Sequence, residues 1–172
     1  MNLLAAWAVA LLAALLPGSD PGSWPQWGGP SRNFVVESRA LAVNWPAEGP
    51  KRLWQRPLGE GYSAIVTDGR TLYTLYRDGT ADVVIALNAA TGATVWQTRY
   101  EAPFDETCSE RLGPVPRAAP LLVGDRIVTI SAGGLMNSFE RASGRLRWSA
   151  NLVAAGSDAV RACGYSASPL AF

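Results

Sequence analysis

The sequence predicts an all-β fold built from four-stranded antiparallel units, and three repeated features lead to that prediction. Two segments share one pattern, in which a strand-like run enters a small-residue turn and a Trp follows the turn glycine by four residues: Ile85 to Trp96 and Met136 to Trp148. A third Trp, Trp54, extends the series with spacings of 42 and 52 residues, the size of one propeller blade. The tetrapeptide GYSA also occurs twice, at 61–64 and 164–167. Repetition on this scale predicts a partial β-propeller.

The first residues form a separate segment. Leu3 to Leu16 is an uninterrupted apolar run of 14 residues that ends at Pro17 and Gly18. A membrane-spanning helix needs about 20 such residues, whereas the apolar part of a secretory signal needs about 7 to 15. We therefore expect residues 1–22 to be a cleaved signal peptide helix, with a buried N-terminal helix as the alternative. The mature protein would be periplasmic or secreted, with no stable membrane span and, for want of a nearby Cys, no lipid anchor.

Residues 23–50 are expected to form an irregular strap over the blades. The stretch from Ser19 to Asn33 is too rich in Pro, Gly and Ser to hold a regular element. Its two aromatic residues, Trp24 and Trp27, would not be left in water, so the strap should be ordered.

Residues 51–172 are predicted to hold the repeats: two complete blades, at about 62–100 and 118–152, and a third begun at 165. The first blade opens with a hairpin over Ser63–Tyr76, in which Asp68-Gly69 is the signal for a two-residue type I′ turn. A strand is also expected before it, over Arg52–Leu58. The other predicted strands cover 83–88, 93–99, 120–123, 126–131, 135–139, 145–152 and 165–172.

The repeated residues have a structural interpretation. The turn glycine supplies a positive φ, and the Trp fills the gap between adjacent blades while its N–H bonds a neighbouring backbone carbonyl. A small residue lies where a strand must pass close to the ring. These residues are Ala86, Gly92 and Trp96 in the first unit and Ser138, Gly144 and Trp148 in the second. An aromatic platform for a ligand is the alternative, and packing is the favoured interpretation.

The two cysteines lie in the loops that follow the repeat tryptophans. Cys108 and Cys163 have neither a C-x-x-C nor a metal-ligand spacing. Equivalent loops of successive blades emerge on one face of a propeller, so in an oxidising compartment we predict a Cys108–Cys163 disulfide. Two unpaired thiols are the alternative.

Composition excludes several functions. The chain has 172 residues with a net charge of +1, which offers no electrostatic footprint for nucleic acid. It has no His, and therefore lacks the commonest general base and transition-metal ligand. No G-x-S-x-G elbow or phosphate loop occurs, and Gly133-Gly134 is interpreted as a turn. We therefore assign no catalytic, cofactor-binding or metal-binding residue.

The repeats resemble the pyrroloquinoline-quinone-type (PQQ-like) propeller repeat, whose pattern is A-x-D-x-x-T-G-x-x-x-W. Asn88 and Glu140 stand where that pattern has Asp. The opening WPQWGGPSRN, with GPKRLW and GYSA downstream, resembles exported PQQ-like proteins grouped with the propeller subunit of the outer-membrane β-barrel assembly machinery. The resemblance covers Trp24 to the end of the chain. The matching positions are Ala86, Asn88, Thr91, Gly92 and Trp96, then Ser138, Glu140, Ser143, Gly144 and Trp148.

The resemblance implies two classes of function. The favoured one is a non-catalytic scaffold that binds protein partners in the cell envelope, with a role in outer-membrane protein assembly and no cofactor. The alternative is a fragment of a quinoprotein dehydrogenase, in which PQQ and Ca²⁺ oxidise an alcohol or sugar. Its candidate carboxylates are Asp105, Glu106, Glu110 and Asp158. Nearby arginines make solvated ion pairs the simpler interpretation of that group: Arg99, Arg111, Arg117 and Arg161.

The chain as given is expected to be an incomplete propeller, because closure takes about four to eight blades. Open ends expose strand edges and apolar faces. We therefore expect the isolated chain to be marginally soluble and to show no PQQ-dependent alcohol oxidation.

Overall fold

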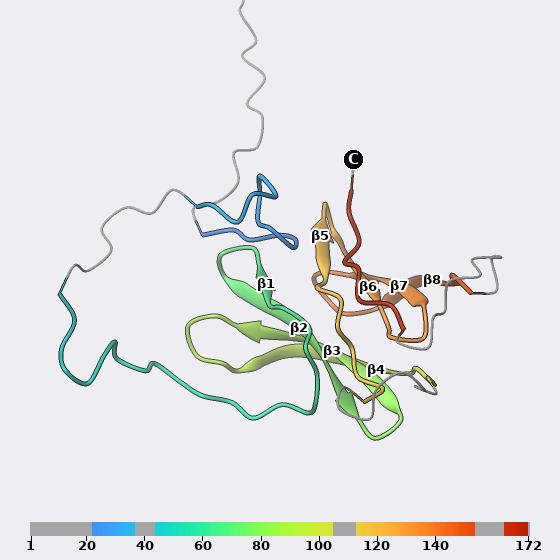
Figure 1. Cartoon of the computed structure of the whole chain (residues 1–172), viewed down its shortest axis with the longest axis horizontal. Coiled ribbons are helices and arrows are strands. Elements are labelled where there is room, and N and C mark those ends of the chain that lie inside the picture. The colour runs from blue at the N-terminus through green and yellow to red at the C-terminus, as the bar shows by residue number, and fades with distance from the viewer. Residues whose placement is uncertain (1–21, 37–43, 105–112, 154–163, 172) are drawn as a thin grey trace, which may run out of the picture.

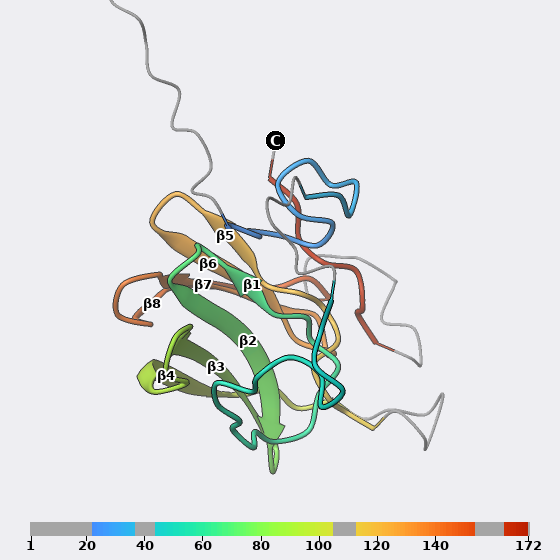
Figure 2. The same ribbon diagram turned by 90° about the vertical axis from the view of Figure 1, so that its left-hand side faces the viewer.

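The computed structural model describes residues 22–36, 44–104, 113–153 and 164–171. These residues form two four-stranded antiparallel sheets that lie against each other (Figures 1 and 2). The first sheet consists of β1 (Val66–Thr67), β2 (Thr71–Asp78), β3 (Ala81–Asn88) and β4 (Thr94–Glu101). The second consists of β5 (Leu121–Val123), β6 (Arg126–Ile130), β7 (Leu135–Glu140) and β8 (Leu146–Asn151). In each sheet the strands are neighbours in chain order.

The predicted all-β class with four-stranded antiparallel units is confirmed, and both repeat tryptophans lie on the outermost strand of their sheet. In the part of the chain that the structure describes, no helix has the length and apolar character needed to cross a membrane. Residues 1–21 of the expected signal peptide lie outside the described residues.

The hairpin between β1 and β2 has a different turn from the predicted one. Thr67 pairs with Leu72, so the connection is longer than a two-residue type I′ turn. Gly69 has a positive φ of 94°, but Asp68 does not. Instead, Asp68 Oδ1 accepts hydrogen bonds from the backbone N–H of Arg70 (3.0 Å) and Thr71 (2.8 Å). The side chain of Asp68 thus replaces a backbone turn with an Asx-type turn.

That turn also perturbs the Asp68 carboxyl. Partial burial raises its pKa, but the hydrogen bonds from the backbone N–H of Thr71 and Arg70 outweigh burial, so the net pKa is lowered. Burial raises the pKa of the neighbouring Tyr73 to about 12, with a further contribution from the charge of Asp68.

Two predicted strands do not form. Residues 52–58 have no backbone ladder with a described strand and are held through side chains, and residues 165–171 likewise contain no strand. A strand needs a neighbouring strand to satisfy its backbone groups, and the described chain offers neither segment such a partner. β2 and β3 run longer than predicted, since β2 extends to Asp78 and β3 begins at Ala81, whereas β5, β6 and β8 are one or two residues shorter than predicted.

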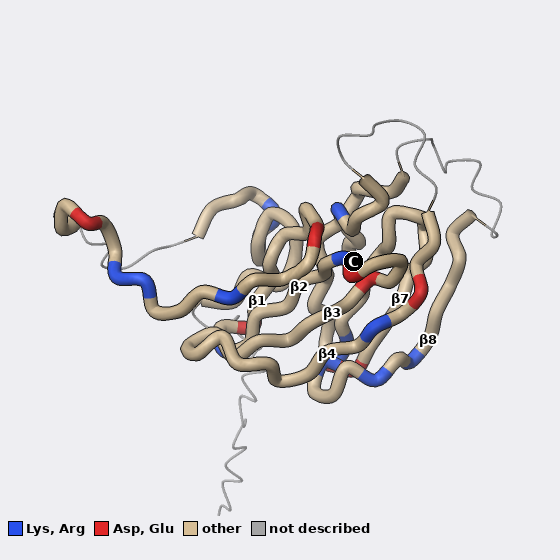
Figure 3. The backbone as a smooth tube through the Cα atoms, turned by 90° about the horizontal axis from the view of Figure 1, so that it is seen from below, with Lys and Arg blue, Asp and Glu red and all other residues tan. Residues whose placement is uncertain are grey.

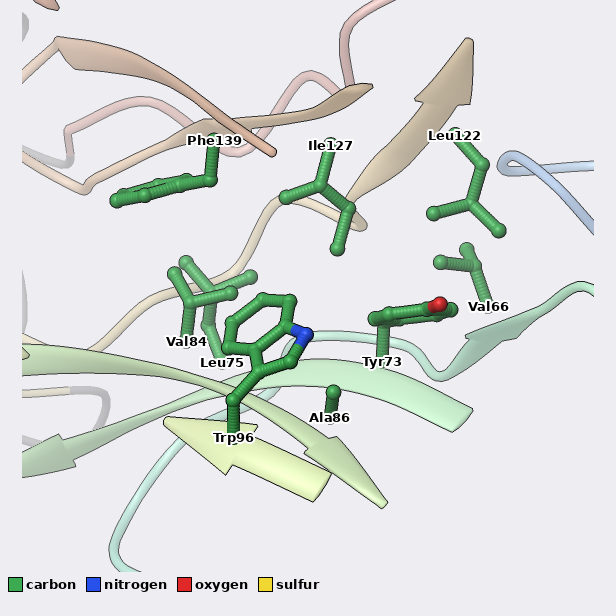
Figure 4. Close-up of a cluster of buried hydrophobic side chains, with 9 residues drawn as sticks. All are labelled: Val66, Tyr73, Leu75, Val84, Ala86, Trp96, Leu122, Ile127 and Phe139. Atoms are coloured by element: carbon green, nitrogen blue, oxygen red, sulfur yellow. The ribbon is translucent and has the colours of Figure 1, made fainter. Parts of the chain in front are cut away.

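The core lies between the two sheets. The face of the first sheet that looks toward the second is built from cross-strand rows, of which Tyr73, Ala86 and Trp96 form one. Figure 4 shows Trp96 projecting from β4 toward the side chains that the second sheet contributes. The buried cluster is Val66, Tyr73, Leu75, Val84, Ala86, Trp96, Leu122, Ile127 and Phe139.

Residues 22–36 cross the inner strands of both sheets. Trp24 exchanges two backbone hydrogen bonds with Thr67, of 2.8 and 2.9 Å, and Leu122 donates one to the carbonyl of Pro25 (2.8 Å). The expectation that both strap tryptophans are covered is wrong for Trp27. It is 53% exposed, and its ring meets that of Phe34 edge-on, with ring centroids 5.3 Å apart.

Candidate functional site

A repeated contact joins each sheet to the element before it. In the second sheet, the turn Arg141–Gly144 connects β7 to β8 and receives the indole of Trp96 from the first sheet. Trp96 Nε1 donates to the carbonyl of Arg141 (2.9 Å), and Thr98 Oγ1 donates to the carbonyl of Gly144 (2.6 Å). A Cβ on Gly144 would lie 2.3 Å from the indole, so only glycine admits the ring. We call such a turn a socket.

The first sheet has the same socket at Ala89–Gly92, between β3 and β4. Its indole comes from Trp54, whose Nε1 donates to the carbonyl of Ala89 (2.9 Å). Arg56 donates to the carbonyl of Gly92 (3.0 Å) from the position that Thr98 holds after Trp96. A Cβ on Gly92 would lie 2.6 Å from Trp54. The two sockets therefore bind a Trp in the same way, through one backbone carbonyl and one glycine.

The two sockets are closed by different side chains at one position. Asn88 Oδ1 accepts from the backbone N–H of Ala90 and of Thr91, each at 3.0 Å. Glu140 Oε2 accepts from Ser143 Oγ at 2.8 Å. The turn glycines have positive φ values of 69° and 71°. Asn88 and Glu140 thus stabilise the turn in the place where the resembled pattern has Asp.

Glu140 also carries the main charge cluster of the second sheet. Its Oε1 bonds Arg145 (2.5 Å) and Arg147 (2.9 Å). Hydrogen bonds from Arg145 and Ser143 lower the pKa of Glu140 to about 2. Positions of both charge signs lie close together around β7 and β8 (Figure 3).

A bulge in each sheet aims the tryptophan. The pairing register shifts between Ala86 and Leu87 in the first sheet and between Ser138 and Phe139 in the second. In both cases the residue before the shift pairs directly with the repeat Trp. Ala86 and Ser138 are both fully buried. The two sheets therefore share the same β-bulge as well as the same sequence motif. Such bulges change the direction of the side chains beside them in antiparallel sheets.

Trp148 is placed like Trp96 but is not covered like it. The side chain of Trp96 is 9% exposed, and that of Trp148 is 45% exposed. All six residues of β8 are exposed, and Ala150 shares the face of Trp148, whereas Leu146 pairs with Phe139 on the opposite face. Within the described ranges, no carbonyl accepts a hydrogen bond from Trp148 Nε1. We call Trp148 and Ala150 the β8 face.

Residues 164–171 cover the inner part of this side of the second sheet. The backbone N–H of Tyr165 donates to the carbonyl of Ala132 (2.8 Å), and its ring lies over Gly134. The hydroxyl of Ser168 accepts from the backbone N–H of Ala119 (2.8 Å). The covering thus starts at the inner strands and leaves the outermost strand, β8, open.

A buried polar cluster at the other end of the interface escaped sequence reasoning. Arg77 bonds Asp82 Oδ1 at 2.8 Å, and the two side chains are 8% and 1% exposed. Arg77 also donates to the carbonyls of Gly79 (3.0 Å) and Ala102 (2.8 Å). Burial raises the pKa of Asp82 despite its partner, and burial also raises the pKa of Tyr100, which pairs with Asp82 across β3 and β4. The signal in the sequence was an Arg and an Asp that flank the β2–β3 turn.

Of the remaining predicted residues, the two that the structure describes make separate contacts. Arg99 forms an ion pair with Asp78, and Arg117 donates to the carbonyl of Gly113 (2.7 Å). In the described residues no three His, Cys, Asp or Glu side chains gather where a metal could bind. The cysteines of the predicted disulfide and the other candidates lie outside the described residues: Cys108, Cys163, Asp105, Glu106, Glu110, Asp158, Arg111 and Arg161.

Comparison with known proteins gives the family. A family model described as "Outer membrane protein assembly factor BamB" matches residues 25–170. No curated protein matches the chain.

Two solved structures are similar over part of their length. The crystal structure of BamB from Moraxella catarrhalis is 22% identical, with a TM-score of 0.38, over 54% of this chain and 24% of that one. A europium-containing methanol dehydrogenase is 21% identical, with a TM-score of 0.45, over 57% of this chain and 18% of that one. The chain therefore spans about a quarter or less of the length of these structures.

The family match extends over most of the chain and agrees with the two repeat motifs, so the resemblance seen in the sequence and the partial β-propeller class are confirmed. This chain belongs to the family of the outer membrane protein assembly factor BamB, whose members carry PQQ-like propeller repeats.

Proposed function

We propose that this chain is a non-catalytic, protein-binding part of a propeller scaffold in the cell envelope, with a role in outer-membrane protein assembly. The observation that carries the proposal is the β8 face. Trp148 repeats a residue that, at two other places in this molecule, binds a backbone turn through one carbonyl and one glycine.

The chemistry of that contact suits protein rather than a small substrate. Its partner supplies a backbone carbonyl that accepts a hydrogen bond and a glycine whose lack of a side chain leaves room for the indole. Both are features of a polypeptide turn. An exposed aromatic side chain of this kind is typical of protein interfaces. Membership in the family supports a partner in the envelope, and export through the predicted signal peptide would bring the chain there.

A fragment of a quinoprotein dehydrogenase is the second candidate, supported by the propeller repeat itself. That chemistry needs oxygen ligands for a cation and flat walls for the quinone. Of the described residues, the buried carboxylate Asp82 already pairs with Arg77, so it is poorly suited to hold Ca²⁺ as well. The carboxylates proposed from the sequence belong to residues that the structure does not describe.

Two measurements separate the candidates. In the organism that encodes the chain, deleting its gene should reduce the amount of folded outer-membrane protein, and the wild-type gene should restore it. A gene with Trp148→Ala should restore less than the wild type does. Dye-linked oxidation of alcohols by the purified chain with added PQQ and Ca²⁺ should be absent. Unchanged outer-membrane proteins together with quinone-dependent oxidation would reverse the choice.

A further inference from the structure

We infer that the β8 face binds the Ala89–Gly92 socket of a second copy of this chain, and that Trp54 of that copy competes for the same socket. The inference concerns self-association of the purified chain and does not depend on the envelope role. It rests on what covers the equivalent face of the first sheet and on which part of the molecule could cover the second.

The type of occupant follows from the internal repeat. The face of the first sheet that carries Trp96 is covered by the second sheet. The β7–β8 turn of the second sheet accepts a hydrogen bond from Trp96 at the carbonyl of Arg141 and leaves room for the indole at Gly144. Trp148 lies at the same position of the same bulged pair of strands. Its occupant should therefore be a sheet that offers a turn with an acceptor carbonyl and a glycine of positive φ.

A second copy carries such a sheet. Its Ala89–Gly92 socket has the required carbonyl and glycine, and the tetrapeptide GYSA at 61–64 precedes that sheet. The same tetrapeptide at 164–167 already covers the inner part of the second sheet. Residues 61–64 of the second copy can thus replace residues 164–167 with an identical sequence, after which its first sheet extends over β8.

Trp54 is the competitor that this association must displace. It is carried by residues 51–58, which form no strand and hold the socket through the side chains of Trp54 and Arg56. Because that contact is intramolecular, it benefits from a high effective concentration. Association of the wild-type chain should therefore be weak, and removal of Trp54 should strengthen it.

The match between β8 and the socket lacks one hydrogen bond. Thr98 and Arg56, two residues beyond their tryptophans, each donate to the carbonyl of the socket glycine. The equivalent residue after Trp148 is Ala150, which has no donor in its side chain. Ala150→Thr would supply the missing hydroxyl at an exposed position, where the substitution leaves the fold intact.

The experiment is sedimentation of the purified full chain over a range of concentrations. Trp54→Ala should convert weak association into clear dimers and higher oligomers, because a head-to-tail contact need not close on itself. Adding Trp148→Ala should weaken that association at least about 30-fold, the usual effect of truncating a buried interface Trp. Trp27→Ala removes an exposed Trp elsewhere and should leave association unchanged.

Two further variants test the geometry. Ala150→Thr should strengthen association about fivefold, as expected for one added hydrogen bond. Gly92→Ala should release Trp54 without promoting association, because its Cβ also blocks an incoming Trp148.

The inference fails if Trp54→Ala remains monomeric, or if W54A/W148A associates as strongly as Trp54→Ala. If Trp54→Ala does not fold, the test uses two other backgrounds, the wild-type chain and Ala150→Thr. In each background, association is compared with and without Trp148→Ala. Association that does not respond to Trp148→Ala in either background would overturn the inference.

Discussion

Trp96 and Trp148 occupy the same position in two sheets with the same strand order and the same bulge, yet Trp96 is 9% exposed and Trp148 is 45% exposed. The strand that carries each residue therefore does not decide its burial. The neighbour does: Trp96 has the Arg141–Gly144 socket, whereas no described turn covers Trp148. The repeat pattern thus places a Trp that can bind a socket. Whether a neighbouring sheet offers that socket determines how much the Trp contributes to the stability of the fold.

The largest difference should appear when each tryptophan is truncated. Trp96→Ala should lower the free energy of unfolding by about 3–5 kcal/mol, because it removes a buried ring from the core between the sheets. Trp148→Ala, made on a half-exposed ring, should cost less than about 1 kcal/mol. Denaturant unfolding of the two variants measures both values. Equal losses would contradict the claim that the neighbour sets the contribution.

The two ion pairs of the first sheet offer a second comparison. Asp82→Ala leaves the buried guanidinium of Arg77 without its counter-charge and should cost about 3 kcal/mol. Asp78→Ala breaks an exposed pair with Arg99 and should cost less than about 1 kcal/mol. Thermal unfolding resolves a gap of this size. A loss at Asp78 as large as that at Asp82 would show that burial does not govern these pairs.

Alanine substitutions at Gly144 and Gly124 distinguish the steric requirement of the socket from the backbone requirement of an ordinary turn. Both have positive φ, so alanine strains the backbone at either site by about 1–2 kcal/mol. At Gly124 a Cβ meets no atom within 4 Å, whereas at Gly144 it would collide with the ring of Trp96. Gly144→Ala should therefore cost about 2 kcal/mol more than Gly124→Ala. Similar losses, measured by denaturant unfolding, would mean that the indole moves aside freely.

The smallest expected effect is a difference between the two socket turns in how the free energy of unfolding depends on pH. The pKa of Glu140 is lowered to about 2 in the folded chain, so its contribution to stability is present above its ordinary value of 4.5 and is lost as pH falls from there toward 2. Glu140→Gln makes the turn neutral, like that of Asn88, and should flatten the pH dependence of unfolding in this window. Glu101→Gln is the matched control on an exposed carboxylate. An unchanged pH profile for Glu140→Gln would count against the lowered pKa.

Sequence patterns predicted the parts of this fold that are set locally. The turn glycines, the tryptophans four residues later and the hairpin connections depend on residues close in the chain, so the repeat motif alone predicted two four-stranded sheets with Trp96 and Trp148 on their outer strands. The Asp68 turn was predicted in place but not in type, because a side-chain oxygen and a positive φ can each close such a turn.

Other features depend on partners distant in the sequence. Residues 52–58 have the composition of a strand, but no described strand pairs with them. The burial of Arg77 and Asp82 involves the segment after β4, where Ala102 accepts from Arg77, and no pattern within β2 or β3 can indicate that contact. The exposure of Trp148 was hidden for the same reason, since its sequence surroundings match those of a buried residue.

The strap at residues 22–36 has a consequence for the order in which the molecule forms. It is bonded to Thr67 and Leu122, so residues synthesised early bind a partner that is synthesised much later. Contacts of such long sequence separation form late in folding, after shorter loops have closed. The start of the chain can therefore pair with β1 early, but its contact with the second sheet must wait until β5 has been made. The last backbone contact of the strap to form is then the one from Leu122 to Pro25, which ties the start of the chain to both sheets.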